Sequence, residues 1–586
     1  MSDEYDILIK NAHIVDGTGA PGYKGTVAVK GERIVAIGEV SGDAGKVIDA
    51  KGHVVSPGFI DVHNHGDMTI IYYPTADGFL RQGITSFVGG NCGSSPGPFG
   101  EYLGIGMSNS DIVNDIAPDN WGTGKMLTRE ELNPHHKEVH GFEIDWHTMG
   151  EFFKKLEDMG GISPNYVPLL GHHQARHIAM GNDNKRAATP EEIEQMKKTA
   201  EQAMLDGCKG MSVGRDYGSN YAEQDEIIAI AKVVSKYGGV FTSHCLRTGL
   251  RVARPFGAPP VNKVGGLLEA INVGRQAKMP VQISHLGSLY DVFPRDNSEL
   301  NIAAAKATLK ILDDAVEEGI DVTFDVIPNI RGFGTGSSNY LVGSLLSWLK
   351  IAGSREQFAE ALRMPGLRKE ITEYIMSGKY RGINPHMSPN WAASKRIMES
   401  NEPSFVDKSV AKIAKEMERE PLDALMEIMT IDPYAKTGSM GRNNPTKYLF
   451  YQHPGCMMGI DTLATDIHKV SRHPPWGVPS ENSFGGWAAF FRMIVREDKI
   501  LSLEEAVRKG TSHSAQKFKL KDRGVLKPGA YADITVFDID TITDKATATN
   551  PCLYPEGIEQ VIVNGTTVIS NSEHTGTKPG KILLNQ

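Results

Sequence analysis

Residues 57–65 read Pro-Gly-Phe-Ile-Asp-Val-His-Asn-His and decide the fold. The apolar run predicts a buried strand that leads directly into His63 and His65. Because alternate residues of a strand share a face, both imidazoles can point at one metal ion beyond the strand. A chain of 586 residues with 19 histidines can contain a His-x-His triplet by chance. The triplet is informative here because it stands at the end of a predicted strand.

Further apolar runs alternate with longer amphipathic stretches after this strand, which is the pattern of a parallel sheet whose strands are joined by helices. The eight runs are Phe59 to Val62, Thr85 to Val88, Tyr166 to Leu170, Gly210 to Val213, Val240 to Ser243, Val281 to Ser284, Val322 to Asp325 and Met457 to Asp461. Eight such units predict an α/β protein with a (β/α)8 TIM barrel.

Both ends of the chain predict a small β domain. Short alternating runs separated by turn residues occupy residues 1–57 and recur in residues 520–586. We expect the two ends to pair into one antiparallel unit, a small β-sandwich domain, and residues 58–519 to form the barrel. Two segments at about 94–146 and 331–450 do not fit a plain barrel and are interpreted as insertions over one barrel mouth.

Composition excludes several classes of partner. Lys and Arg number 62 against 71 Asp and Glu, a formal net charge of −9, which argues against nucleic acid. The acidic start predicts no signal peptide, and no apolar stretch approaches the about 18 residues of a membrane span. Five widely spaced cysteines without a CxxC pair favour a reducing cytoplasm. A small-molecule substrate is expected, and a homo-oligomer is left open.

Most of the predicted strands end at a side chain that can bind a metal. Cys92 follows the second strand, His172 and His173 the third, His244 the fifth and His285 the sixth, and Asp461 ends the eighth. Active sites of barrel enzymes gather at the carboxyl ends of the strands. The pattern therefore predicts a metal site built from residues far apart in the chain.

These residues together resemble the amidohydrolase superfamily and, within it, the D-aminoacylase (N-acyl-D-amino-acid deacylase) family. The matching stretches are residues 57–65, Gly89 to Gly93, Gly171-His172, Ser284-His285, Arg523-Gly524 and Ala532-Asp533. The resemblance implies a site for one or two zinc ions held by His63, His65, Cys92, His244 and His285, with Asp461 beside them. Most amidohydrolases use a carboxylated lysine as the bridging ligand, but Lys209 precedes its strand, so Cys92 is the expected bridge.

Such a ligand set suits hydrolysis of an amide. Zn²⁺ binds imidazole and thiolate at about 2.0 to 2.3 Å and leaves a position for water. Binding lowers the pKa of that water toward roughly 7, and the ion also polarises the amide carbonyl. We expect Asp461 to act as general base and then as general acid toward the leaving nitrogen, and His172 to bind the substrate.

The resemblance weakens at positions that face the substrate. After strand eight the family carries His-Pro-Arg, whose arginine is thought to bind the substrate carboxylate as a planar fork, and this chain has His473-Pro474-Pro475. Gly287 likewise stands where the family has a lysine. Either Arg472 supplies the substrate-binding cation, or the substrate lacks a free carboxylate there. The stiff turn before Trp476 favours the second alternative.

Three functions are compatible with the sequence. The first is hydrolysis of an N-acyl-D-amino acid or a related acylated amine. The second is opening of a cyclic amide or imide, as in hydantoinases and dihydroorotases. The third is a non-catalytic scaffold on the same fold, against which the complete set of ligands argues.

Overall fold

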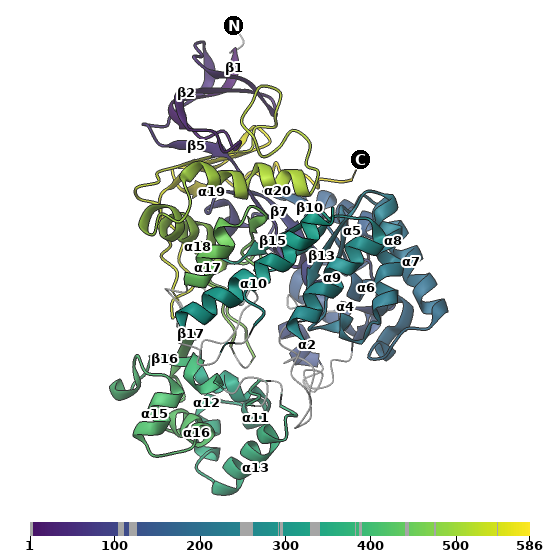
Figure 1. Ribbon diagram of the computed structural model, residues 1–586, viewed down its shortest axis with the longest axis vertical. Coiled ribbons are helices and arrows are strands. Elements are labelled where there is room, and N and C mark those ends of the chain that lie inside the picture. Colours follow the sequence, from purple (N-terminus) through teal and green to yellow (C-terminus); the bar gives the residue numbers. More distant parts are fainter. Residues whose placement is uncertain are drawn as a thin grey trace.

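The structure is a computed structural model of the 586-residue chain. It describes residues 4–103, 110–116, 126–246, 262–290, 292, 297–328, 340–380, 382–385, 390–439, 445–473, 476–547 and 549–585. Pro474, Pro475 and parts of both predicted insertions therefore lie outside the described residues. In Figure 1 a β domain lies at the top, the parallel strands and their helices lie in the middle, and a group of short helices lies at the bottom.

The central strands run parallel and confirm the α/β class. One sheet has the order β10-β7-β6, and a second has the order β11-β12-β13-β14-β15-β18. Their bounds are β6 Phe59–Asp61, β7 Ile84–Gly89, β10 Asn165–Pro168, β11 Leu170–Gly171, β12 Gly210–Gly214, β13 Val240–His244, β14 Val281–Ile283, β15 Val322–Val326 and β18 Cys456–Met458. The last strand ends earlier than predicted, so Asp461 lies in the loop that follows it.

Backbone hydrogen bonds connect the two parallel sheets on both sides. Between β10 and β11 the N–H of Leu169 donates to Gly89 O at 3.1 Å. On the opposite side Val62 N–H donates to Met458 O at 3.1 Å, and Asp461 N–H donates to His63 O at 2.8 Å. These last two bonds place the loop after β18 directly beside the two histidines that follow β6.

Helices connect the parallel strands, and α7 shows why they form where they do. Thr189 accepts a hydrogen bond from Glu192 N–H while the Glu192 side chain caps Thr189 in return, and Pro190 occupies the first turn. The helix buries Met196 and Ala200. The helices of this layer are α5 Met149–Asp158, α6 His172–Met180, α7 Pro190–Leu205, α8 Gln224–Lys236, α9 Lys263–Ala277, α10 Ser298–Glu317, α17 Pro445–Gln452, α18 Asn482–Phe490, α19 Leu503–Gly510 and α20 Ser512–Lys517.

A further sheet joins the two ends of the chain in the order β22-β21-β20-β19-β5-β1-β2-β3, with β4 beside β1. Its strands are β1 Tyr5–Ile14, β2 Tyr23–Lys30, β3 Arg33–Gly38, β4 Ala44–Asp49, β5 Val54–Pro57, β19 Ile534–Phe537, β20 Ile558–Val563, β21 Thr566–Ser570 and β22 Glu573–His574. The expectation of a purely antiparallel sheet is wrong, because β1 pairs in parallel with both β4 and β5. Hydrogen bonds from Ile34 N–H to Ala530 O and from Ala532 N–H to Glu32 O curl the sheet back on itself.

The helical group at the bottom of Figure 1 has a hydrophobic core of its own, formed by residues such as Leu345, Phe358, Ile413 and Leu425. Its elements are α11 Leu346–Ala352, α12 Arg355–Ala361, α13 Pro365–Met376, α14 Trp391–Ser394, β16 Lys395–Glu399, α15 Val410–Glu416, α16 Pro421–Ile431 and β17 Lys436–Ser439. The first of the two predicted insertions, at about 94–146, contains α2 Ser110–Ile116 and α4 Arg129–His140. In the described part of the chain, no helix combines the length and apolarity that a membrane crossing requires.

Candidate metal centre

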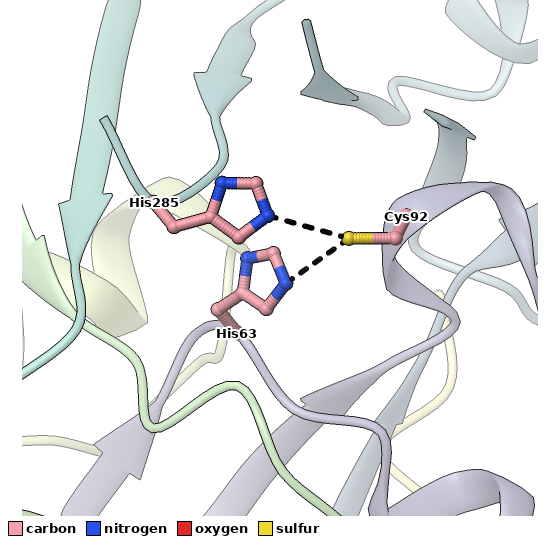
Figure 2. Close-up of side chains that lie close together, drawn as sticks. All are labelled: His63, Cys92 and His285. Atoms are coloured by element: carbon pink, nitrogen blue, oxygen red, sulfur yellow. Dashed lines mark hydrogen bonds between the residues drawn. The ribbon is translucent and has the colours of Figure 1, made fainter. Parts of the chain in front are cut away.

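Three of the predicted ligands surround the thiol of a fourth, Cys92. Its Sγ lies 3.4 Å from His63 Nε2, 3.4 Å from His244 Nδ1 and 3.5 Å from His285 Nε2. Figure 2 shows His63 and His285 pointing at Cys92 from separate elements. Because β6, β7, β13 and β14 all end at this edge, the strands themselves bring the four side chains together.

Asp461 extends the cluster on its more accessible side. Its Oδ1 lies 3.2 Å from His65 Nε2 and 3.5 Å from His63 Nε2. Two overlapping groups can therefore hold a metal, namely His63 with Cys92 and His285, and His63 with His65 and Asp461. The His63 side chain is fully buried, whereas 16% of the Asp461 side chain is exposed, so Asp461 lies on the more exposed side of the cluster.

The backbone around the cluster adopts a disfavoured conformation at three functional residues. Cys92, His285 and Asp461 have φ values of 53°, 39° and 49°. This left-handed region is uncommon for residues other than glycine, and such strain gathers at sites where the side-chain direction matters. The turns that aim these three side chains are therefore held in place by the surrounding structure.

Opposite charges dominate the electrostatics of the cluster. Burial alone would raise the pKa of the Cys92 thiol, but His63 and His244 beside it hold that pKa well below its usual value. Burial opposes charge on Asp461 as well, yet His63 and His65 lower its pKa to about 2. Burial disfavours the charged form of His65, but Asp461 and Cys92 raise its pKa to about 10. The site thus stabilises a thiolate and a carboxylate among protonated imidazoles, and a metal ion can replace those protons.

Two buried aspartates, missed in the sequence analysis, fix the histidine rings. Asp216 Oδ2 lies 3.1 Å from His244 Nε2, which leaves Nδ1 of that ring facing Cys92. Asp325 Oδ1 lies 3.4 Å from His63 Nδ1 and accepts the backbone N–H of His285 at 2.7 Å. Partners of this kind set which nitrogen of a histidine binds a metal. Asp216 follows β12 by two residues, so the rule of strand ends could have found it.

A third buried carboxylate, Asp61, joins the histidine turn to the Asp461 loop. It accepts hydrogen bonds from Trp487 Nε1 at 2.9 Å and from Ile460 N–H at 3.0 Å. The Asn64 amide donates to it at 3.3 Å. Burial raises the pKa of Asp61 to about 7 although these donors and His63 lower it. Asp61 thus holds the turn that carries His63 and His65 next to the loop that carries Asp461, although it is not itself a member of this ligand group.

The two predicted substrate-binding residues lie in other surroundings. His172 is fully buried, with Nδ1 2.9 Å from Ser219 Oγ and Nε2 3.0 Å from Glu226 Oε1. Arg472 forms an ion pair of 2.7 Å with Asp115 in α2, and 59% of its side chain is exposed. In the described residues neither side chain contacts the Cys92 cluster, so their contacts with a substrate stay predictions.

The sequence of this chain is similar to those of known proteins. A family model described as the amidohydrolase family matches residues 460–569. The chain is 30% identical to N-acyl-D-glutamate deacylase of Alcaligenes xylosoxydans xylosoxydans over 590 residues, which covers 100% of this chain and 97% of the relative. The chain belongs to the N-acyl-D-amino-acid deacylase family of amidohydrolases.

Solved structures of deacylases also match this family member. The crystal structure of N-acyl-D-glutamate deacylase from Bordetella bronchiseptica contains zinc and a phosphonate inhibitor that mimics the tetrahedral intermediate. It matches this chain with a TM-score of 0.67 at 26% identity and covers 99% of both chains. A D-aminoacylase described for its binuclear metal centre matches with a TM-score of 0.68 at 25% identity, covering 99% of this chain and 100% of its own.

Proposed function

We propose that this deacylase family member is a zinc-dependent hydrolase of N-acyl-D-amino acids or related acylated amines. The convergence of three imidazoles on the Cys92 thiol, with Asp461 on the accessible side, is the observation that carries the proposal. Zinc in the Bordetella relative and the shared family support it. The bond that breaks is the amide C–N bond, and the products are a carboxylate and an amine.

The donor set fits zinc by its chemistry. One thiolate, imidazole nitrogens and one carboxylate oxygen are the ligands that zinc takes in proteins, and the low pKa of Cys92 keeps the thiolate form available. We propose His63, His65, Cys92, His244 and His285 as ligands of one or two ions. When bound, zinc acts as a Lewis acid and makes hydroxide available near neutral pH.

Asp461 is the proposed proton carrier. Its Oδ1 faces His65 and His63, and its pKa of about 2 keeps the carboxylate ionised at neutral pH. The carboxylate takes the proton of the attacking water and then delivers it to the leaving nitrogen, so the proton count balances. Asp216 and Asp325 hold the histidine rings in place during both steps.

We further propose that the two parallel sheets form one (β/α)8 TIM barrel of residues 58–519, and that residues 1–57 and 520–586 form one small β-sandwich domain. The bonds from Leu169 to Gly89 and from Val62 to Met458 support the barrel. The curl of the terminal sheet supports the sandwich. All five cysteines are free thiols, which supports a reducing compartment such as the cytoplasm.

Replacement of Asp216 by asparagine is expected to weaken zinc binding about 10- to 100-fold, because His244 loses the carboxylate that fixes its ring. Competition with a chromogenic chelator measures the change. Asp225→Asn is the control, because Asp225 is an exposed carboxylate in α8. This variant should bind zinc as the wild type does. Unchanged zinc affinity in Asp216→Asn would show that Asp216 does not orient His244.

Turnover of a substrate panel tests the proposed reaction. The zinc-loaded protein is assayed against N-acyl-D-amino acids, N-acyl-L-amino acids, hydantoins and cyclic imides. We expect release of a free amino acid from the N-acyl-D series and loss of that activity with chelator. Hydrolysis of only the cyclic compounds would replace the proposal by the cyclic amide alternative, and turnover of none of them would contradict it.

A further inference from the structure

The turn that carries Cys92 is fastened to the neighbouring strand β12 by one serine hydroxyl. Ser212 lies in the middle of β12 and is fully buried. Its Oγ donates to Gly90 O and accepts the backbone N–H of Gly93 at 2.9 Å. The two bonds enclose Asn91 and Cys92, so one side chain holds the backbone on both sides of the candidate ligand.

The alternation of side chains along β12 explains why Ser212 reaches this turn. Met211 and Val213, its two neighbours in the strand, belong to the main hydrophobic core. Because successive side chains of a strand point to opposite faces, Ser212 points to the other face of the sheet. β12 itself contains no histidine, cysteine or carboxylate. The strand therefore contributes to the cluster through this hydroxyl and not through a ligand.

The backbone of β12 lies so close to the turn that no side chain can stand between them. A Cβ atom at Gly214 would lie 2.1 Å from Cys92 O, and a Cβ atom at Gly171 in β11 would lie 2.6 Å from Gly93 O. Glycine is the residue that permits such a close approach of two backbones. The glycines thus bring the strands against the turn, and Ser212 supplies hydrogen bonds between β12 and the turn.

The turn needs this support because its conformation is unfavourable by itself. Cys92 has a φ of 53° and stands between Gly90 and Gly93, whose φ values are 84° and 83°. A left-handed residue other than glycine persists where its surroundings fix it. Thr242 in β13 adds a second anchor by donating to Asn91 Oδ1 at 3.3 Å. Figure 2 shows the thiol leaving this turn toward the two histidines drawn with it.

We propose that Ser212 is a positioning residue for the Cys92 thiolate and thereby sets how tightly the site binds zinc. The assignment rests on the proposed function, because it takes Cys92 as a ligand. Ser212 contacts neither the metal nor the substrate in this assignment. It keeps the left-handed turn closed, so that Sγ stays within 3.5 Å of three imidazoles.

Cobalt in place of zinc makes the thiolate contact measurable. A Co²⁺–thiolate bond gives a charge-transfer absorption, here called the thiolate band, and Cys92→Ala defines the spectrum without it. We expect Ser212→Ala to show a weaker thiolate band for each bound cobalt ion. Its zinc affinity, measured by chelator competition, should fall about 10-fold, as it does when a metal ligand loses its supporting partner.

Variants of equal shape separate the hydroxyl from the space that it fills. Ser212→Thr keeps a hydroxyl and should retain the thiolate band and the zinc affinity, whereas Ser212→Val has the same shape without the hydroxyl and should weaken both. Ser86→Ala is the matched control, because Ser86 is a buried serine of β7 whose Oγ accepts the amide of Asn165 at 3.3 Å, at the amino end of β10. This control should match the wild type in both measurements.

Several results would overturn the assignment. An unchanged thiolate band and zinc affinity in Ser212→Ala would do so, even with a lower unfolding temperature of the metal-free protein, because Ser212 would then serve the fold only. Equal effects in Ser212→Thr and Ser212→Val would show that the hydroxyl is not responsible. Failure of both hydroxyl-free variants to fold would likewise assign the hydroxyl to the fold alone.

The spectra also distinguish this proposal from the proposed function. A wild type that shows the thiolate band but hydrolyses no member of the substrate panel would contradict the proposed reaction, and a weaker band in Ser212→Ala would still support the role of Ser212. A wild type that binds cobalt without the band would overturn Cys92 as a ligand and the role of Ser212 together.

Discussion

Cys92→Ala is expected to lose zinc during purification and to lower turnover by more than about 100-fold. The Sγ atom lies within 3.5 Å of three imidazoles, so its removal takes away the centre of the proposed ligand set. Changes in the partners of metal ligands already cost about 10- to 100-fold, and loss of a ligand itself must cost more. Elemental analysis after gel filtration gives the zinc content, and chelator competition gives the affinity.

Cys208→Ala is the matched control, because Cys208 is also a fully buried thiol. Burial and Asp206 raise the pKa of Cys208 well above its usual value, so it supplies no thiolate. The control should retain zinc and turnover. Full zinc content and activity in Cys92→Ala would show that the Cys92 thiolate is not a zinc ligand. Lys209 cannot replace Cys92 without rearrangement. It stands just before the amino end of β12, and its Nζ donates to Lys519 O at 3.4 Å.

The sequence was sufficient to predict the strands and the meeting of the candidate ligands because one physical rule covers both. Parallel strands end at a common edge, and a residue directly after a strand has its direction fixed by the strand. His244 ends β13, and His63, Cys92 and His285 lie two or three residues after their strands, so the same edge brings all four together. Asp461, like Cys92, lies three residues beyond its strand, and its N–H bond to His63 O holds it at the same edge.

Features that depend on contacts distant in the sequence could not be predicted. Asp325 lies inside a strand, and only the packed structure shows that it contacts two histidines that follow other strands. Parallel pairing of β1 with β4 and β5 depends on how the connecting segments cross, which alternation of apolar residues does not encode. Arg355 and Trp476 are separated by 120 intervening residues, and no local pattern links an arginine at a helix start to a distant tryptophan.

The insertions show how substrate recognition can change while the metal cluster is kept. The ligands stand on strand ends that the central sheets hold rigidly, whereas the loop after β18 is fastened by α2 through Asp111 and Asp115 and by α12 through Arg355. We therefore expect substitutions in these added segments to leave the candidate ligands in place.

Asp461→Asn is expected to lower kcat by at least about 100-fold with the fold intact and zinc largely retained. Asparagine keeps the size of the side chain but cannot accept a proton from water, and general acid–base catalysis contributes about 10²- to 10⁴-fold. Zinc content should change less than in Cys92→Ala, because His63, Cys92 and His285 form a ligand group without Asp461. Steady-state kinetics, zinc content and thermal unfolding of the same preparation separate these effects.

Asp466→Asn provides the control for this substitution, since Asp466 is an exposed carboxylate in the same loop whose Oδ1 accepts the N–H of His468 at 2.7 Å. Its kcat should equal that of the wild type. The strain at Asp461, with φ of 49°, aims its carboxylate at His65, and asparagine tolerates this conformation well, so a large loss of kcat reports on proton transfer rather than on the backbone. A kcat within about 3-fold of the wild type would remove Asp461 from the proton path and leave that task to another group at the accessible side of the cluster.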